Sequence, residues 1–69
     1  MALIKLFQTT TIHPEEKNER DSALSLLETQ MGVAILRKKV LSVSGPHANV
    51  VEINRTPTLI YTASVVYEG

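Results

Sequence analysis

Arg37, Lys38 and Lys39 form the most compact cluster of charge in this 69-residue chain. Cations that neutralise phosphates release counterions, which favours binding to nucleic acid or to a smaller anion such as a signalling nucleotide. Arg55 is a further cation that we expect to join this binding surface. The net charge of zero and the lack of an aromatic neighbour speak against nucleic acid. An acidic protein patch would use the same residues, and so would a strand edge that lysines protect from aggregation.

The two histidines, His13 and His47, are the available bases of ordinary catalytic type. Nucleophilic catalysis needs a Ser, Thr or Cys held by a base that a third group orients. Ser42 and Ser44 lie near His47 in the sequence, but no nucleophile motif surrounds them, and a turn offers no rigid oxyanion arrangement. We therefore expect His47 to be a solvated turn residue and the protein not to be an enzyme.

No residue pattern indicates a metal or a cofactor. The chain has no Cys, which removes disulfides and thiolate metal sites. Neither His13 nor His47 has metal-ligand spacing to the acidic residues, and the three glycines are isolated, so no phosphate-binding loop is expected. Glu15, Glu16 and Glu19 cluster where a helix is predicted to begin, and solvated charge is ordinary there.

The length of the chain predicts one domain, residues 1–69, with a small core. Chains this short usually gain stability from disulfides, a metal or oligomerisation. Because the first two have no support here, we expect a homo-oligomer, and the apolar β-branched residues are more numerous than one helix can cover. Residues 1–32 carry a net charge of −2 and residues 33–69 one of +2, so copies can attract one another.

A membrane partner is not expected. The longest apolar runs have four residues, such as 33–36, against the roughly 20 that a spanning helix needs. The first five residues place their charge after the apolar ones and lack a cleavage site, which is not the pattern of a secretory signal. These features predict a cytoplasmic protein.

The first half of the chain predicts a strand followed by a helix. Residues 2–12 are rich in apolar and β-branched types, and apolar residues on both sides indicate an interior strand that is covered on both faces, at least over its first half. Pro14 suits the first position of a helix, and the acidic residues after it complement the helix dipole. We predict a helix over 15–31, with Gly32 as its stop. Its apolar face consists of Ala23, Leu24, Leu27 and Met31.

Residues 33–44 are ambiguous, because the basic run interrupts an apolar pattern. They fit a strand with a bulge near the run, a strand that passes beyond its sheet, or an extension of the helix through Leu36. Ser44–His47 predicts a turn, 49–55 a short strand, and the alternation over 58–67 a half-buried strand. The predicted fold is α+β with the order β-α-β-β-β, one amphipathic helix packed on a small, mostly antiparallel sheet. Its expected core includes Leu27, Ala63 and Val65.

Three of these segments carry a resemblance to a known family. A strand containing Ile4-Lys5-Leu6-Phe7, an acidic amphipathic helix and a final strand reading Tyr61-Thr62-Ala63-Ser64-Val65-Val66-Tyr67-Glu68 resemble the very small sporulation-associated proteins of endospore-forming bacteria and their short phage relatives. The resemblance implies the same fold and a bacterial or phage origin. It supplies no catalytic residue to carry over, and the basic run and the 44–47 segment have no counterpart in it.

These features together predict a small non-enzymatic binding or regulatory protein. It acts as a homo-oligomer that docks on or inhibits a protein partner. The alternative is an oligomer that binds or sequesters an anionic ligand, a signalling nucleotide or nucleic acid, through Arg37, Lys38 and Lys39.

Overall fold

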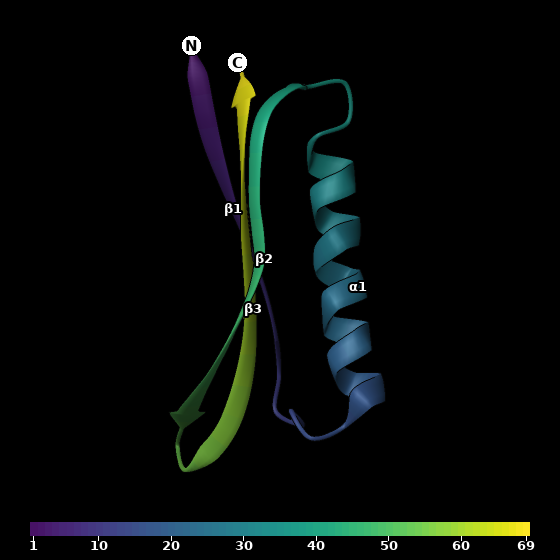
Figure 1. Cartoon of the computed structure of the whole chain (residues 1–69), viewed down its shortest axis with the longest axis vertical. Helices are drawn as coiled ribbons and strands as arrows, with labels where there is room; N and C mark the ends of the chain where they lie inside the picture. Colours follow the sequence, from purple (N-terminus) through teal and green to yellow (C-terminus); the bar gives the residue numbers. More distant parts are fainter.

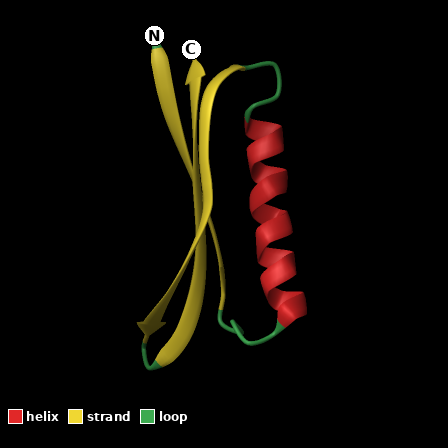
Figure 2. Cartoon of the chain, viewed as in Figure 1, coloured by secondary structure: helices red, strands yellow, loops and turns green.

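The computed structural model of residues 1–69 contains one helix and a three-stranded sheet. The elements follow in the order β1 (Ala2–Thr11), α1 (Lys17–Ala34), β2 (Lys39–Ile53) and β3 (Thr56–Glu68). β3 lies between the other two strands and pairs antiparallel with both (Figure 1). α1 runs along one side of the sheet, and the connections lie at the two ends of the molecule (Figure 2). The predicted α+β fold is confirmed, with the order β-α-β-β.

The core forms where the middle of α1 meets the central strand. Leu27 and Val65 are completely buried, and they form one cluster with Phe7 and Ala63. Met31, predicted to share the apolar face of the helix, is half-buried against this cluster. The core positions expected at Leu27, Ala63 and Val65 are therefore confirmed.

The prediction that β1 is an interior strand covered on both faces is wrong. β1 lies at an edge of the sheet, and α1 covers only one of its faces. On the covered face, Phe7 is buried and the Thr9 hydroxyl donates a 2.8 Å hydrogen bond to the carbonyl oxygen of Ala23. On the other face, Ile4 and Leu6 are 68% and 76% exposed. Apolar residues on both sides of a strand therefore do not require two covering layers within one chain.

The helix begins two residues later than predicted. The backbone N–H of Glu16 donates a 3.0 Å hydrogen bond to the carbonyl of His13, which closes a turn that contains Pro14. Pro14 thus belongs to the turn that precedes α1, and proline is well suited to such a position because its φ is fixed. In the first turns of the helix, the Lys17 ammonium lies 4.0 Å from a carboxylate oxygen of Asp21.

The helix also ends later than predicted, at Ala34, and Gly32 lies inside it. Among the interpretations of residues 33–44, the helix extension is correct for its first two residues, and β2 starts only at Lys39. Between them Arg37 has a φ of 63°. A residue in this left-handed region commonly follows the end of a helix and redirects the chain.

The segment Ser44–His47 does not separate two strands, so the sheet has one strand fewer than predicted. β2 is continuous, and its register against β3 shifts around Leu41 and around Gly45–Pro46. Each shift adds one residue to β2, which is the definition of a bulge. Gly45 supplies a φ of 98° there, and an edge strand tolerates Pro46, which has no N–H to donate. The true reversal occurs at Asn54-Arg55, whose positive φ values of 51° and 64° match the right-handed twist of a hairpin.

Replacing Leu27 by alanine tests how α1 packs on the sheet. We expect Leu27→Ala to lower the free energy of unfolding by about 2–5 kcal/mol, because truncation of a fully buried leucine leaves a cavity. Leu26→Ala is the matched control, since Leu26 is 53% exposed. Urea unfolding followed by circular dichroism at one protein concentration measures both variants. Equal midpoints for the two would contradict the orientation of the helix.

Two glycine substitutions are expected to act in opposite directions. Gly32→Ala should raise the free energy of unfolding by about 0.5–1 kcal/mol, because alanine favours a helix interior and nothing lies within 4 Å of the added methyl group. Gly45→Ala should lower it, because the residue has a φ of +98° and its new Cβ would lie 2.8 Å from the carbonyl oxygen of Thr62. Thermal melts of the two variants check this. If Gly32 instead ended the helix in a left-handed conformation, its replacement would be destabilising.

Candidate functional site

The basic run lies in the connection between α1 and β2. Arg37 and Lys38 belong to the loop, and Lys39 is the first residue of β2. The sequence argument that charge interrupts a core strand is therefore wrong, since the chain turns in solvent at this point. The Lys38 ammonium lies 5.3 Å from the centre of the Tyr67 ring. That distance is within the range of a cation–π interaction, which gives this lysine a structural role.

All three residues of the run are exposed, and none forms an ion pair with a carboxylate. Lys39 lies opposite Glu68 in the β2–β3 register. The Glu68 carboxylate is instead bound by the ammonium group of Met1, at 2.8 Å. Three cations without a carboxylate partner therefore lie near one end of the molecule, where an anion can reach them.

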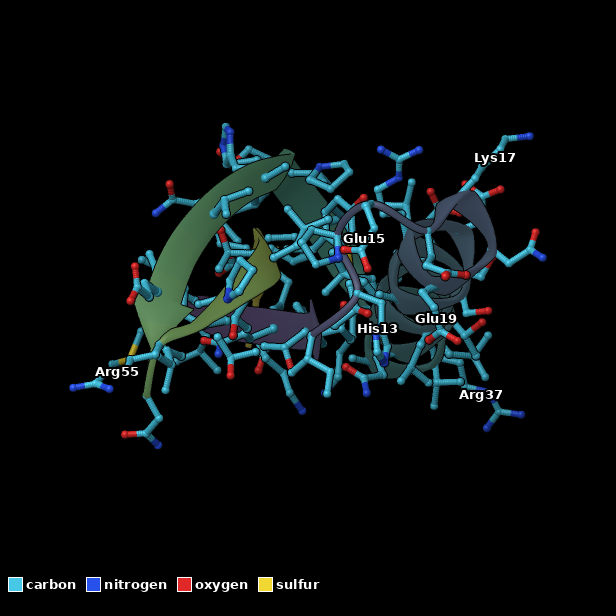
Figure 3. All side chains as sticks on the ribbon, turned by 90° about the horizontal axis from the view of Figure 1, so that it is seen from below. His13, Glu15, Lys17, Glu19, Arg37 and Arg55 are labelled. Carbon is cyan, nitrogen blue, oxygen red and sulfur yellow. The ribbon has the colours of Figure 1, made fainter.

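Arg55 does not join the basic run. It lies in the β2–β3 hairpin turn, at the opposite end of a molecule that is 42 Å long (Figure 1). Viewed along the long axis, Arg37 and Arg55 point away from each other on different sides (Figure 3). The four cations predicted to form one binding surface thus form a cluster of three and a separate arginine.

The residues considered for catalysis make only local contacts. The Ser44 hydroxyl oxygen and Nε2 of His47 are 3.2 Å apart across the second bulge of β2, where both side chains are exposed. His13 lies at the turn before α1, with its Nδ1 3.9 Å from a carboxylate oxygen of Glu15 (Figure 3). The Ser44–His47 pair has no third group that orients the imidazole, and neither surface hollow of the protein includes it. It lacks the constellation that activates a nucleophile.

Side chains able to hold a metal are also dispersed. No group of three His, Asp or Glu residues is close enough to share an ion. Separately, the protein has no helix that is both long enough and apolar enough to cross a membrane.

The largest feature of the surface is apolar rather than charged. α1 packs on β1 and β3 and leaves β2 without a covering layer, so 14 of the 15 residues of β2 are exposed. Thirteen large apolar side chains are exposed in the whole chain, against a core cluster of four buried residues. The exposed ones are Met1, Leu3, Ile4, Leu6, Ile12, Leu26, Val33, Leu36, Val40, Leu41, Val43, Val50 and Ile53. The sequence indicated this surface only through the number of its apolar β-branched residues, which is larger than one helix can cover.

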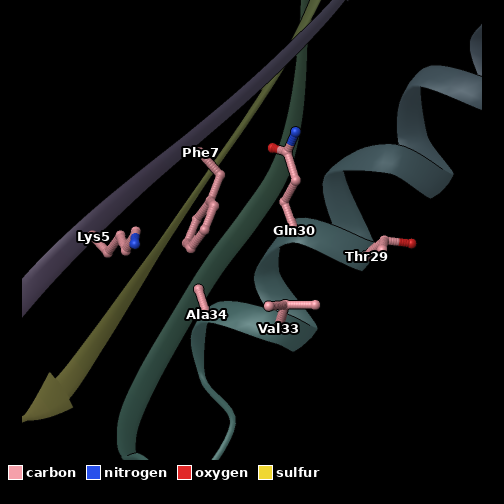
Figure 4. A pocket seen from close by; sticks show the side chains of 6 residues that line it. All are labelled: Lys5, Phe7, Thr29, Gln30, Val33 and Ala34. Carbon is pink, nitrogen blue, oxygen red and sulfur yellow. The ribbon is translucent and has the colours of Figure 1, made fainter.

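Two shallow hollows border β1. The larger, of about 460 Å³, lies between β1 and the last turns of α1, where Phe7, Val33 and Ala34 form its apolar wall (Figure 4). Lys5, Thr29 and Gln30 are its polar residues. The smaller hollow, of about 300 Å³, is lined by Leu6, Phe7, Gln8, Thr62 and Ala63. An exposed apolar surface of this kind, next to a free strand, is typical of a protein–protein interface.

Comparisons of the chain with family models, with curated proteins and with solved structures found no match. The resemblance to the small sporulation-associated proteins therefore stays a prediction, and the function has to be inferred from the residues and their geometry.

Proposed function

We propose that this protein is a non-enzymatic binding protein that acts as a homo-oligomer and docks on a protein partner. The observation that carries the proposal is the exposure of thirteen large apolar side chains, against six buried apolar residues of which four form the core cluster. Exposed apolar surface is costly in water, at about 25 cal/mol per Å². A second copy that covers part of this surface removes that cost and enlarges a core that is otherwise very small.

The shape of a single chain supports the same proposal. Its accessible surface is 4990 Å², whereas a compact monomer of this mass exposes roughly 4300 Å². Its radius of gyration is 13.5 Å, against about 11 Å for a compact chain of this length. The excess of about 700 Å² is close to the roughly 800 Å² that each partner buries in a standard interface.

A separate apolar strip remains for another partner. In the β2–β3 register, Val43 lies opposite the buried Val65 and Val50 opposite the buried Leu59, so both point to the side of the sheet that holds α1. α1 does not cover them, and they are 53% and 59% exposed. An apolar segment of a partner protein can lie along this strip beside the helix, as in other complexes in which grooves accept extended or helical peptides.

Light scattering over a range of micromolar concentrations tests the proposed assembly. We expect a mass of at least twice the 7.6 kDa of one chain, because the uncovered apolar surface favours association. Glu19→Ala, a change in the exposed first turn of α1, should leave the mass unchanged. A 7.6 kDa species at every concentration, stable to heat, would show that one chain tolerates its exposed surface, and the proposal would fail.

The second candidate function is binding of an anionic ligand by the basic run. It is favoured by the exposure of Arg37, Lys38 and Lys39 at one end of the molecule without carboxylate partners. Repetition of the run in an oligomer multiplies these cations, and linked sites raise the effective affinity for an anion long enough to reach more than one of them.

Replacing the three cations by glutamine tests this second candidate function. The triple variant should weaken binding to a labelled oligonucleotide or nucleotide at low salt and flatten the salt dependence. Its melting temperature should fall only slightly, since the Lys38–Tyr67 interaction contributes about 0.5–1 kcal/mol. Arg55→Gln, at the far end of the molecule, is the matched control and should bind as the parent does. Unchanged binding by the triple variant would show that the run does not bind these anions, and this second candidate function would fail.

A further inference from the structure

The outer edge of β1 carries a row of free backbone groups. The N–H of Gly69 donates a 2.8 Å hydrogen bond to the carbonyl of Met1, which continues the β1–β3 register by one pair. Residues of an antiparallel strand alternate between bonding inward and outward. The odd-numbered residues of β1 therefore bond to β3, and the even-numbered ones direct their N–H and C=O groups away from the sheet. The outward-bonding residues are Ala2, Ile4, Leu6, Gln8 and Thr10.

The two free edges of the sheet differ in how they are protected. Proteins protect edge strands with proline, bulges and charge, since an unprotected edge pairs with other strands. β2 has Pro46, two bulges, and charges at Lys39 and Glu52. β1 is regular over its whole length, contains no proline, and carries one charge, on Lys5. β1 is thus the edge that is open to a further strand.

We propose that β1 pairs antiparallel with β1 of a second copy, across a two-fold axis that passes between the two Leu6 residues. This inference rests on the proposed homo-oligomer and names its interface. The pairing joins the two sheets into one of six strands. Both helices then lie on the same side of that sheet, because the axis is perpendicular to it.

The register follows from the residues themselves. With Leu6 opposite Leu6 of the partner, Ile4 lies opposite Gln8 and Ala2 opposite Thr10, so every outward-bonding residue has a partner. If one β1 strand slid by two residues so that Ile4 lay opposite Leu6 of the partner, Lys5 would lie opposite Lys5. Like charges in direct opposition are destabilising. A shift in the other direction would pair Ala2 with Ile12, which lies beyond the end of β1. The Leu6-centred register avoids both faults.

The same arrangement covers the larger hollow. Phe7 and Lys5 line that hollow from β1, and Val33 lines it from α1. In the Leu6-centred register, Lys5 of one copy lies directly opposite Phe7 of the other, on the side of the sheet that holds the helices. The hollows of the two copies therefore adjoin at the axis. Val33, which is 71% exposed in one chain, then borders an interface instead of water.

Single cysteines test the pairing directly, because the chain has none of its own. In the proposed register the Cα atoms of Leu6 and its symmetry mate are about 5.5 Å apart, within the range of a disulfide. The Cα atoms of Gln8 and its mate are separated by about 14 Å, which is too far. Leu6→Cys should therefore give a product of doubled mass on a non-reducing gel after mild oxidation. Gln8→Cys, on the same face and edge, is the matched control and should stay single.

A mixed sample adds a positive test of the register. Ile4→Cys combined with Gln8→Cys should form a heterodimer, and neither variant should cross-link alone. All three positions are exposed, and circular dichroism confirms that the variants fold. An oligomer by light scattering in which Leu6→Cys does not cross-link, or cross-links no better than Gln8→Cys, would overturn this interface and leave the proposed function standing. A monomeric parent would overturn both.

Discussion

The limiting constraint in this fold is that one helix has to cover three strands. A helix with its side chains is about 10–12 Å wide, and neighbouring strands are about 4.8 Å apart, so one helix covers about two strands. α1 covers β1 and the central strand β3, and Leu27 packs in one cluster with Val65. β2 is left without a layer on either face, and the face of β1 that points away from the helix is also uncovered. The exposed apolar surface, the elongated shape and the proposed assembly all follow from this imbalance.

Charged and polar side chains contribute less to the stability of this fold. No polar side-chain atom is buried without a hydrogen-bond partner, and the ion pairs join exposed groups, which contribute little to stability. The buried Thr9–Ala23 hydrogen bond is the polar contact that ties α1 directly to the sheet. In the proposed homo-oligomer, specific recognition is therefore best supplied by backbone pairing and apolar contact, with Lys5 limiting the registers that the edge of β1 accepts.

The parts of the fold that could be predicted are those in which local pattern and tertiary environment agree. The alternation over β3 and the spacing around Leu27 each have one physical interpretation, a half-buried strand and the covered face of a helix. The position of β1 within the sheet could not be predicted from the sequence. Apolar residues on both of its faces are compatible with a second covering layer from the same chain and equally with one from another copy. Gly45-Pro46 marks an irregularity in either a turn or a bulge, and only the pairing with β3 distinguishes the two. The basic run was singled out correctly as exposed charge, but its apparent position in a strand depended on ending the helix at Gly32.

The connectivity of the sheet also bears on the order in which the protein folds. β2 and β3 are joined by the two-residue turn at Asn54-Arg55, so their pairs begin between near neighbours in the sequence. β1 pairs with β3 only across the whole of α1 and β2, and closing such a long loop costs entropy and time. The edge of β3 that pairs with β1 is therefore the last to be occupied during folding. At high concentration that strand can come from a neighbouring chain, and β1 is then exchanged between copies as a swapped element.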